Sequence, residues 1–332
     1  MKILLWKIGA LGDIVMTTPL VRQLRRALPG ASIDYLTGRG CASILESNPH
    51  IDRIRSFDES ILYGGQVGRL HEVLPLLRGY DCIFALDKHW IFPLLARIAG
   101  APARIGFRRR PHEGLLLTKT VRYGALRHEI DYYLDLAEAA GWPVRRDDVA
   151  LEGPVEAACE CAPGSVALIN SGGDNANESS KARRMPDTLF GELVEACAAQ
   201  HPVAFVGSAS EASYYERFAG ASRTNLCGRT SLAEATAVLR QAARVITTDT
   251  GLMHLAAAAN RQVTAVFGPT HPLRKCPPGA RWAWGDEARY DPRYELFGTA
   301  PAGGYFGSLT VADILEQTHP SPFAASYTPE PV

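Results

Sequence analysis

The 332-residue sequence has no excess of charge of either sign, because 35 lysines and arginines balance 35 aspartates and glutamates. A neutral total argues against a general nucleic-acid-binding protein, whose surface is normally basic. No apolar run reaches the length of a membrane-spanning helix. The apolar stretch before Gly9 is too short for the core of a signal peptide. We therefore expect a cytoplasmic protein with no nucleic-acid partner.

The chain also lacks the cysteine and carboxylate patterns of common metal sites. Its seven cysteines are an odd number and contain no pair of Cys-x-x-Cys units, which argues against a zinc site and favours free thiols in a reducing compartment. Walker A, His-Glu-x-x-His, Gly-x-Ser-x-Gly and Asp-x-Asp motifs at strand ends are absent too. We predict no resident metal and no cofactor.

What is present is an alternation of strand-like and helix-like segments in two successive sets. In the first half, the expected strands are residues 3–8, 32–37, 80–86 and 104–107, and the expected helices are residues 14–28, 93–99 and 132–140. In the second half, the expected strands are residues 166–170, 203–206, 244–247 and 263–267, and the expected helices are residues 189–200, 232–241, 252–260 and 310–317. Strands separated by helices imply parallel sheets with right-handed crossovers.

A Gly-, Pro-, Ala- and Cys-rich stretch separates the two sets and predicts the domain boundaries. We expect a first α/β domain over residues 1–152, a linker over 153–164 and a second α/β domain over 165–318. The Pro-rich residues 319–332 are expected to form a disordered tail. In open parallel sheets, ligands bind at the carboxyl ends of the strands, so the architecture indicates a nucleotide- or sugar-binding protein of two lobes.

The segment Asp249-Thr250-Gly251 stands between an expected strand and an Ala-rich helix. A helix start exposes unpaired N–H groups and a partial positive charge, and Gly251 lets a phosphate approach the backbone. His254, in the first helical turn, can face the same anion. In the alternative interpretation Asp249 or Thr250 is only a helix N-cap and His254 is only a surface residue.

A second glycine-containing turn, residues 9–13, follows the first expected strand. It has no third glycine, so it resembles a dinucleotide-binding fingerprint only superficially. Asp13 stands where the helix begins and is either an N-cap carboxylate or a general base, and the two roles are compatible because a carboxylate at a helix N-terminus stays ionised.

A third candidate segment follows the strand over residues 166–170. This segment, residues 170–175, contains Gly172 and Gly173 and leads into a basic stretch over residues 181–184. Backbone amides in the glycines, together with a basic residue, are suited to hold a diphosphate, and Ser171 and Gly172 are its candidate binding residues. The alternative interpretation is a solvated basic loop.

With these segments identified, the chain resembles the lipopolysaccharide heptosyltransferase family, glycosyltransferase family 9, from about Met1 to about Glu316. Segments similar to the family occur in order along the chain, at residues 8–13, 17–20, 128–134, 225–232, 248–254 and 267–270. Where members usually have Lys-Arg/His-Trp-Pro, this chain has Arg183-Arg184-Met185-Pro186. The resemblance therefore selects Arg183 by its distance to Pro186, but Lys181 by residue type.

The resemblance implies a GT-B fold, in which two Rossmann-like lobes with parallel sheets face a central cleft and the second lobe binds most of the donor. It also implies an inverting, metal-independent enzyme that transfers heptose from ADP-heptose to a lipopolysaccharide-type glycan. By position, Asp13 matches the family's catalytic base. Asp249, Thr250, Gly251 and His254 match the sugar-diphosphate site, Glu211 the ribose carboxylate, and Thr230 the residue beside the adenine.

The acceptor site is predicted from basic residues of the first half. Candidate acceptor-binding residues are Gly12, Lys88, His89, Arg108 and Arg127. An anionic glycolipid or oligosaccharide at the cytoplasmic face of the inner membrane would suit such a surface, although a solvated charged face has the same composition. Two alternatives to a glycosyltransferase are a non-catalytic sugar-nucleotide-binding protein of the same fold and an NAD-dependent dehydrogenase.

Overall fold

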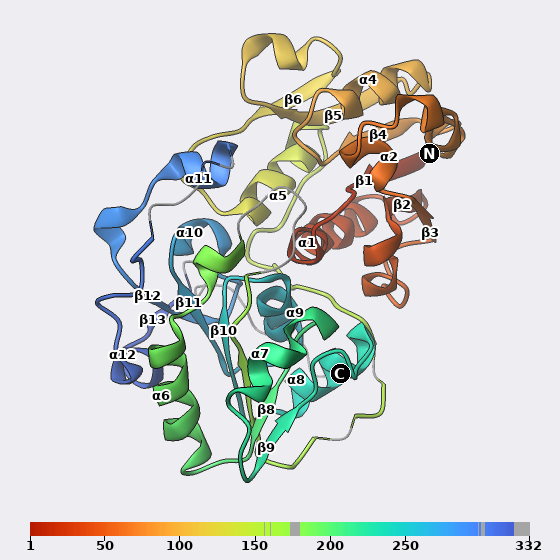
Figure 1. The fold of residues 1–332 in the computed structure, drawn as a ribbon. Helices are drawn as coiled ribbons and strands as arrows, with labels where there is room; N and C mark the ends of the chain where they lie inside the picture. Colours follow the sequence, from red (N-terminus) through yellow and green to blue (C-terminus); the bar gives the residue numbers. More distant parts are fainter. Residues whose placement is uncertain (156, 160, 173–179, 298, 300–302, 322–332) are drawn as a thin grey trace. The chain divides into compact units, whose positions relative to one another are not determined.

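The computed structural model describes residues 1–155, 157–159, 161–172, 180–297, 299 and 303–321. It divides into two compact units, Met1–Arg146 and Asp147–Val332, each built around its own sheet (Figure 1). The linker expected at residues 153–164 stays a prediction, and two of its residues, 156 and 160, lie outside the described residues. The two α/β units with parallel sheets agree with the predicted fold class.

The first unit contains a six-stranded parallel sheet in the order β3-β2-β1-β4-β5-β6. Its strands are β1 (Lys2–Trp6), β2 (Ser32–Gly38), β3 (Arg53–Phe57), β4 (Cys82–Ala85), β5 (Ala103–Arg108) and β6 (Lys119–Arg122). The central strands β1 and β4 are continuous apolar runs because both faces of the sheet are covered by helices. The strand order reverses between β1 and β4, which is where doubly wound sheets bind ligands.

Helices cover both faces of this sheet. They are α1 (Leu11–Ala27), α2 (Ser60–Tyr63), α3 (Leu70–Val73), α4 (Ile91–Ile98) and α5 (Glu129–Ala139). Helices α1 and α5 lie side by side on one face. On the other face, Trp6 of β1 packs against Phe92 of α4, with ring centroids 4.7 Å apart, in a cluster that also contains residues of α2 and α3.

The second unit contains a seven-stranded sheet in the order β13-β12-β11-β10-β7-β8-β9, parallel except at β13. Its strands are β7 (Val166–Ile169), β8 (Val203–Phe205), β9 (Arg223–Asn225), β10 (Arg244–Thr248), β11 (Val263–Phe267), β12 (Arg281–Trp284) and β13 (His319–Pro320). Here the strand order reverses between β7 and β10. The structure therefore defines one expected binding edge in each unit.

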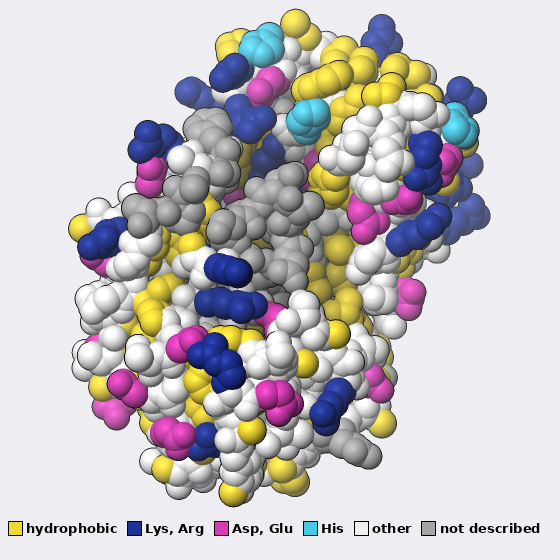
Figure 2. Space-filling view, viewed as in Figure 1, with side chains coloured by type: hydrophobic (Ala, Val, Ile, Leu, Met, Phe, Trp, Pro, Cys, Tyr) yellow, Lys and Arg dark blue, Asp and Glu magenta, His cyan; other side chains and the backbone are white. Residues whose placement is uncertain are grey.

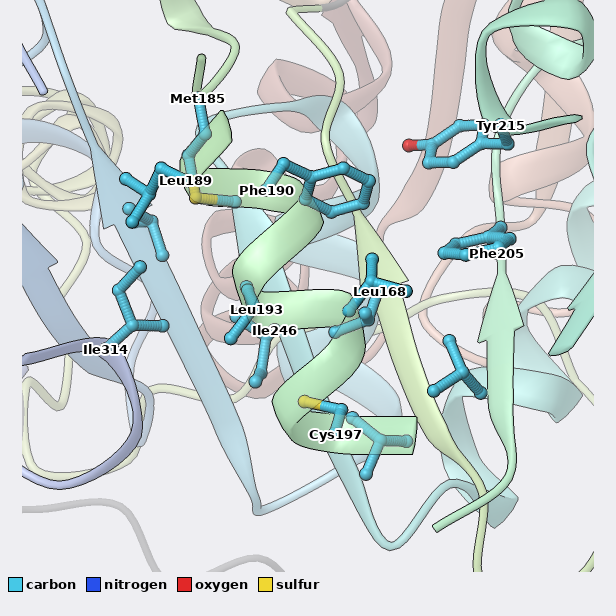
Figure 3. Close-up of a cluster of buried hydrophobic side chains, with 14 of the residues drawn as sticks. Leu168, Met185, Leu189, Phe190, Leu193, Cys197, Phe205, Tyr215, Ile246 and Ile314 are labelled. Atoms are coloured by element: carbon cyan, nitrogen blue, oxygen red, sulfur yellow. The ribbon is translucent and has the colours of Figure 1, made fainter. Parts of the chain in front are cut away.

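The second core lies between this sheet and the amphipathic helix α6. The helices of the unit are α6 (Asp187–Ala198), α7 (Ala212–Glu216), α8 (Leu232–Gln241), α9 (Gly251–Ala259), α10 (Pro272–Lys275), α11 (Pro292–Phe297) and α12 (Val311–Leu315). Leu189, Phe190 and Leu193 of α6 belong to one buried cluster with Leu168 and Ile246 of the sheet (Figure 3). Helices α8 and α9 lie side by side elsewhere in the unit.

The prediction of a disordered tail over residues 319–332 is wrong for its first two residues. His319 and Pro320 form β13 and pair antiparallel with Trp282 and Arg281 of β12. The indole N–H of Trp282 donates to the Pro320 carbonyl at 3.1 Å, and its ring lies 4.6 Å from the ring of His319. These aromatic contacts order a segment whose proline content predicted disorder. Residues 322–332 lie outside the described residues.

Candidate functional site

The binding edge of the second unit is formed where β7 and β10 end. Ser171 follows β7 and its backbone N–H donates to the Thr248 hydroxyl at 2.9 Å. The same hydroxyl lies 2.5 Å from the Ser171 carbonyl oxygen, so the two segments are joined by a pair of contacts. Ser171 and Gly172 are buried. The structure thus brings two predicted donor segments together, although residues 173–175 of the first lie outside the described residues.

The Asp249-Thr250-Gly251 turn is buried at the start of α9. Asp249 is 3% exposed, Thr250 5% and His254 2%, so the interpretation of His254 as a surface residue is wrong. Thr250 occupies the N-cap position, but its side chain makes no capping hydrogen bond. Within the described part of the chain, its hydroxyl oxygen has no hydrogen-bond partner at all. A buried hydroxyl of this kind, at the start of a helix whose first N–H groups have no partner within the helix, is suited to contact a ligand.

Arg183 lies beside this turn. Its Nη1 is 3.5 Å from Asp249 Oδ2, its Nε donates to the Tyr294 hydroxyl at 3.1 Å, and its guanidinium lies over the Tyr294 ring. Lys181 is exposed. Of the two cations that the sequence left as alternatives, only Arg183 has a described ion pair with a predicted donor-site residue.

A second carboxylate lies close behind this turn, at Glu295 of α11. Burial raises the pKa of Glu295, even though the Tyr290 hydroxyl donates to it at 2.7 Å and Arg274 Nε lies 3.6 Å away. Asp249 raises the pKa of Glu295 further, because the negative charges of the two carboxylates repel each other. Arg183 therefore pairs with Asp249, while Lys275 and Arg274 are the cations that act on Glu295.

The predicted nucleotide residues Glu211 and Thr230 belong to two adjacent loops. Glu211 follows β8, accepts hydrogen bonds from the Ser208 N–H and hydroxyl at 3.0 Å each, and pairs with Arg184 Nη2 at 3.0 Å. Thr230 follows β9 and is half-buried. The Gly228 N–H donates to the Gly207 carbonyl at 3.1 Å and holds the loops together. Both residues thus stand at carboxyl ends of strands in the same unit.

The binding edge of the first unit contains three charged residues at the ends of β1 and β4. Lys7 follows β1, Asp13 lies in the first turn of α1, and Asp87 lies two residues after β4. The Lys7 ammonium is 2.5 Å from Asp87 Oδ1 and 3.2 Å from Asp13 Oδ2. Burial lowers the pKa of Lys7, but the two carboxylates outweigh that effect and hold it well above its usual value. The side chain of Asp13 is 29% exposed.

Two of the predicted acceptor residues take part in ion pairs inside the first unit. Lys88 lies 2.8 Å from the buried Glu129 and 3.9 Å from the centre of the Tyr123 ring. Arg127 pairs with Asp135 at 2.8 Å. These contacts do not exclude acceptor binding, but they give both cations a structural role that the sequence did not indicate.

The remaining predicted acceptor residues differ in their burial and contacts. Arg108 Nε donates to the Thr120 hydroxyl at 3.1 Å, His89 is exposed, and Gly12 is buried in the first turn of α1. Lys88 and His89 line one hollow, whose volume of about 10 Å³ suits a water molecule but not a sugar. On the face in Figure 2, basic side chains lie among acidic ones in both units, as the neutral composition predicts.

Sequence reasoning missed Asp87, Tyr294 and Glu295. Asp87 had a usable indication, because a charged residue directly after a buried strand lies at the binding edge of a parallel sheet. The other two follow an irregular segment, and nothing in their local sequence places them beside Asp249. Among the described residues, no three His, Cys, Asp or Glu side chains are grouped to hold a metal ion, and no helix is long and apolar enough to cross a membrane.

A family model described as "Glycosyltransferase family 9 (heptosyltransferase)" matches residues 75–285. The chain belongs to this family. It is therefore a glycosyltransferase, and the dehydrogenase alternative is set aside. Lipopolysaccharide heptosyltransferase 2 of Escherichia coli K12 is 28% identical over 296 residues, which cover 82% of this chain and 84% of that protein. Lipopolysaccharide heptosyltransferase 1 of Pseudomonas aeruginosa is 27% identical over 290 residues, which cover 82% of this chain and 80% of that protein.

Solved structures of family members have the same fold. E. coli ADP-heptose lipopolysaccharide heptosyltransferase II superposes with a TM-score of 0.72 at 22% identity, covering 96% of this chain and 97% of that one. A family 9 glycosyltransferase from Veillonella parvula gives a TM-score of 0.75 at 20% identity, with 94% of each chain covered. These similarities support the two-lobed GT-B fold class.

Proposed function

We propose that this protein transfers heptose from ADP-heptose to a lipopolysaccharide-type acceptor, with inversion at the anomeric carbon and without a metal ion. The observation that supports the donor half most directly is the buried Asp249-Thr250-Gly251 turn, which opens α9 with Arg183 beside it. The curated relatives are lipopolysaccharide heptosyltransferases, and one related structure holds ADP-2-deoxy-2-fluoro heptose. ADP-heptose is therefore the donor to test first.

The donor diphosphate would bind where helix N–H groups and a guanidinium converge. The start of α9 supplies N–H donors and a partial positive charge, and Arg183 supplies a full positive charge. Ser171 and Gly172 would complete this pocket, with His254 in the first turn of α9. Glu211 would accept the ribose hydroxyls, and Thr230 would lie beside the adenine. Since these charges and dipoles are fixed before reaction, they can stabilise the leaving diphosphate without a metal.

The chemical step needs a base on the acceptor side, and we assign it to Asp13. The acceptor hydroxyl oxygen attacks the anomeric carbon and forms the new glycosidic bond. The bond from that carbon to the diphosphate oxygen breaks with its electron pair, and ADP leaves. The hydroxyl proton passes to Asp13, whose carboxylate is partly exposed and stands at the ligand-binding edge of the first sheet.

The acceptor would be an anionic glycolipid core or oligosaccharide bound by the first unit. We assign five residues of this unit to the acceptor: Gly12, which is next to Asp13, and Lys88, His89, Arg108 and Arg127. An anionic acceptor anchored in the inner membrane would bring the protein to the cytoplasmic face of that membrane, where basic side chains favour anionic lipids.

Donor turnover tests this function. The purified protein would be incubated with ADP-heptose, and separately with ADP-glucose, UDP-glucose and GDP-mannose, together with heptose-deficient lipopolysaccharide core. Of the four donors, we expect only ADP-heptose to release its nucleotide and to increase the mass of the acceptor by one heptose. A chelator should not change the rate of this transfer. Asp13→Asn should lower kcat by about 10²-fold or more, because it removes the general base, and should leave ADP affinity within twofold.

Two other outcomes would contradict the proposal. Tight binding of ADP-heptose without transfer to any core acceptor would favour a non-catalytic sugar-nucleotide-binding protein. Wild-type turnover by Asp13→Asn would remove Asp13 from the mechanism while leaving the donor assignment intact.

A further inference from the structure

Lys7 is bound by three acceptors at the ligand-binding edge of the first unit. Its ammonium lies 2.5 Å from the Gly9 carbonyl oxygen, 2.5 Å from Asp87 Oδ1 and 3.2 Å from Asp13 Oδ2. The first two contacts are hydrogen bonds, and the third is an ion pair. The Lys7 side chain is 6% exposed, and its position is therefore determined by protein atoms rather than by water.

Asp87 holds this arrangement from the neighbouring strand. Its Oδ1 contacts Lys7, while its Oδ2 accepts a hydrogen bond from the Ile8 N–H at 2.8 Å. The carboxylate thus binds both the lysine and the backbone of the loop that leads into α1. Because its side chain is only 12% exposed, removing Lys7 alone would leave a poorly hydrated negative charge.

One thiol and three phenols around the cluster are neutral in the pH range where a carboxylate titrates. Asp13 acts on the ionisation of Cys41 of the turn after β2, Tyr63 of α2 and Tyr133 of α5, and Lys7 acts on that of Tyr35 of β2. Burial raises the pKa of Cys41 to about 11 and raises the pKa of each tyrosine above its usual value. Two further carboxylates act on these groups: Glu59 on Cys41, and Glu129, which pairs with Lys88, on Tyr133. Among these charges, Lys7 is in direct contact with Asp13.

We propose that Lys7, held in place by Asp87, is a positioning residue for Asp13: it orients the carboxylate and keeps it ionised until the acceptor hydroxyl arrives. This inference rests on the proposed function, in which Asp13 is the general base. The contact uses Oδ2 of Asp13, and the partly exposed side chain remains accessible to a hydroxyl group.

The Asp87 carboxylate stabilises Lys7 during the reaction. When Asp13 takes the acceptor proton, it becomes neutral and its ion pair with Lys7 ends. Asp87 still compensates the buried ammonium, so the protonated state of Asp13 does not leave an unpaired charge. A lysine paired with Asp13 alone would oppose the proton transfer more strongly, because the whole compensation of its charge would be lost in that step.

The pH dependence of kcat/KM for the acceptor tests this proposal, with one variant that removes the Lys7–Asp87 ion pair and one that removes only its carboxylate. Lys7→Met/Asp87→Asn removes the cation together with its buried partner, so neither charge is left unpaired. Asp87→Asn keeps the cation and removes the competing carboxylate. The acid limb is the pH range in which activity rises as Asp13 loses its proton. We expect it to move to higher pH by up to about one unit in the double variant, because the lost cation contacts Asp13 directly, while the loss of the Asp87 carboxylate offsets only part of that effect.

In Asp87→Asn the acid limb should stay or move down, since Lys7 then has Asp13 as its remaining carboxylate. A purely structural role would lower kcat/KM equally at every pH, so wild-type limbs in both variants would overturn the proposal. Melting temperature and ADP affinity verify that each variant is folded.

Asp13→Asn separates this inference from the proposed function. If Asp13→Asn is inactive and the limbs do not move, only the role of Lys7 is wrong. If Asp13→Asn transfers heptose at the wild-type rate, the base assignment fails and the role of Lys7 fails with it.

Discussion

At the scale of single residues, the expected binding edge of each unit places a cation beside a carboxylate, with at least one of the two buried. Lys7 pairs with Asp13 and Asp87 in the first unit, and Arg183 pairs with Asp249 in the second. In each pair the partners come from different chain segments, and at least one side chain is nearly inaccessible to water. Charges of this kind cost desolvation energy unless they are paired, so their retention at a ligand-binding edge favours a role in binding or catalysis.

Arg183 and Lys181 are distinguished by their surroundings, and this leads to a prediction about donor affinity. Arg183→Gln should weaken ADP binding about tenfold or more, since one charge-assisted hydrogen bond contributes about 1.5–3 kcal/mol. Lys181→Gln is the matched control and should change the ADP dissociation constant less than twofold, because Lys181 is exposed. Isothermal titration calorimetry would measure both. The reverse ranking would assign the diphosphate to Lys181.

At the scale of secondary-structure elements, α1 compensates for a proline in its interior. Pro19 has no N–H, so the Val15 carbonyl loses its usual partner four residues along the helix. The Thr18 hydroxyl donates to that carbonyl at 2.7 Å and replaces the missing bond. Both Thr18 and Pro19 are buried, and water cannot substitute for the hydroxyl. The Thr-Thr-Pro segment of the sequence therefore has a local structural reason, independent of any ligand.

Thr18→Val should destabilise the first unit by about 1–3 kcal/mol, because it leaves a buried carbonyl without a donor. The loss corresponds to several degrees in melting temperature. Thr18→Val/Pro19→Ala should recover most of it, since the N–H of an alanine at position 19 can bond to the Val15 carbonyl. Thermal unfolding followed by circular dichroism would measure both variants. A double variant as unstable as the single one would contradict this account of the helix.

The elements that were predicted correctly differ from the missed ones in their burial. Fully buried strands such as β1, β4 and β11 are continuous apolar runs, and their positions agreed with the prediction within two residues. Five of the described strands were missed: β3, β6, β9, β12 and β13. All five are at least partly exposed, and β3, β6 and β9 are edge strands that carry charged residues. A charged, half-exposed strand has neither a continuous apolar run nor a clear alternation, so its sequence resembles a loop.

At the scale of the whole molecule, the two units have separate cores and separate ligand-binding edges. The core of the first unit is formed by β1, β4 and α4, and the core in Figure 3 is formed by α6 with β7, β8 and β10. All residues assigned to the donor belong to the second unit, while Asp13 and the assigned acceptor residues belong to the first. Binding of ADP alone should therefore affect the two units differently.

Hydrogen exchange with and without ADP would test this division. At 100 times its dissociation constant, ADP stabilises the conformation that binds it by about 2.7 kcal/mol. We expect slower exchange in residues 208–230 and 247–256, and unchanged exchange in residues 2–38. AMP, which lacks the second phosphate, is the control and should protect residues 247–256 less. Equal protection of residues 7–14 by ADP would contradict the assignment of the donor to the second unit.

The sequence by itself determined the class of the fold and the position of the principal turns. Buried strands, amphipathic helices and a strand–turn–helix segment such as 244–259 are local patterns, and their periodicity can be recognised without any knowledge of the neighbouring strands. The family resemblance rested on such local segments as well, in their order along the chain. For the same reason Asp13 and Asp249 could be named as candidates before their surroundings were known.

Only the tertiary structure decided which of these candidates have partners. Lys7 and Asp87 are 80 positions apart, and Ser171 and Thr248 are 77 positions apart. They meet because the order of strands places β4 beside β1 and β10 beside β7. That order depends on long-range packing of helices on sheets, which no local periodicity encodes. Arg183 lies beside Asp249, and His319 joins a sheet, for the same physical reason.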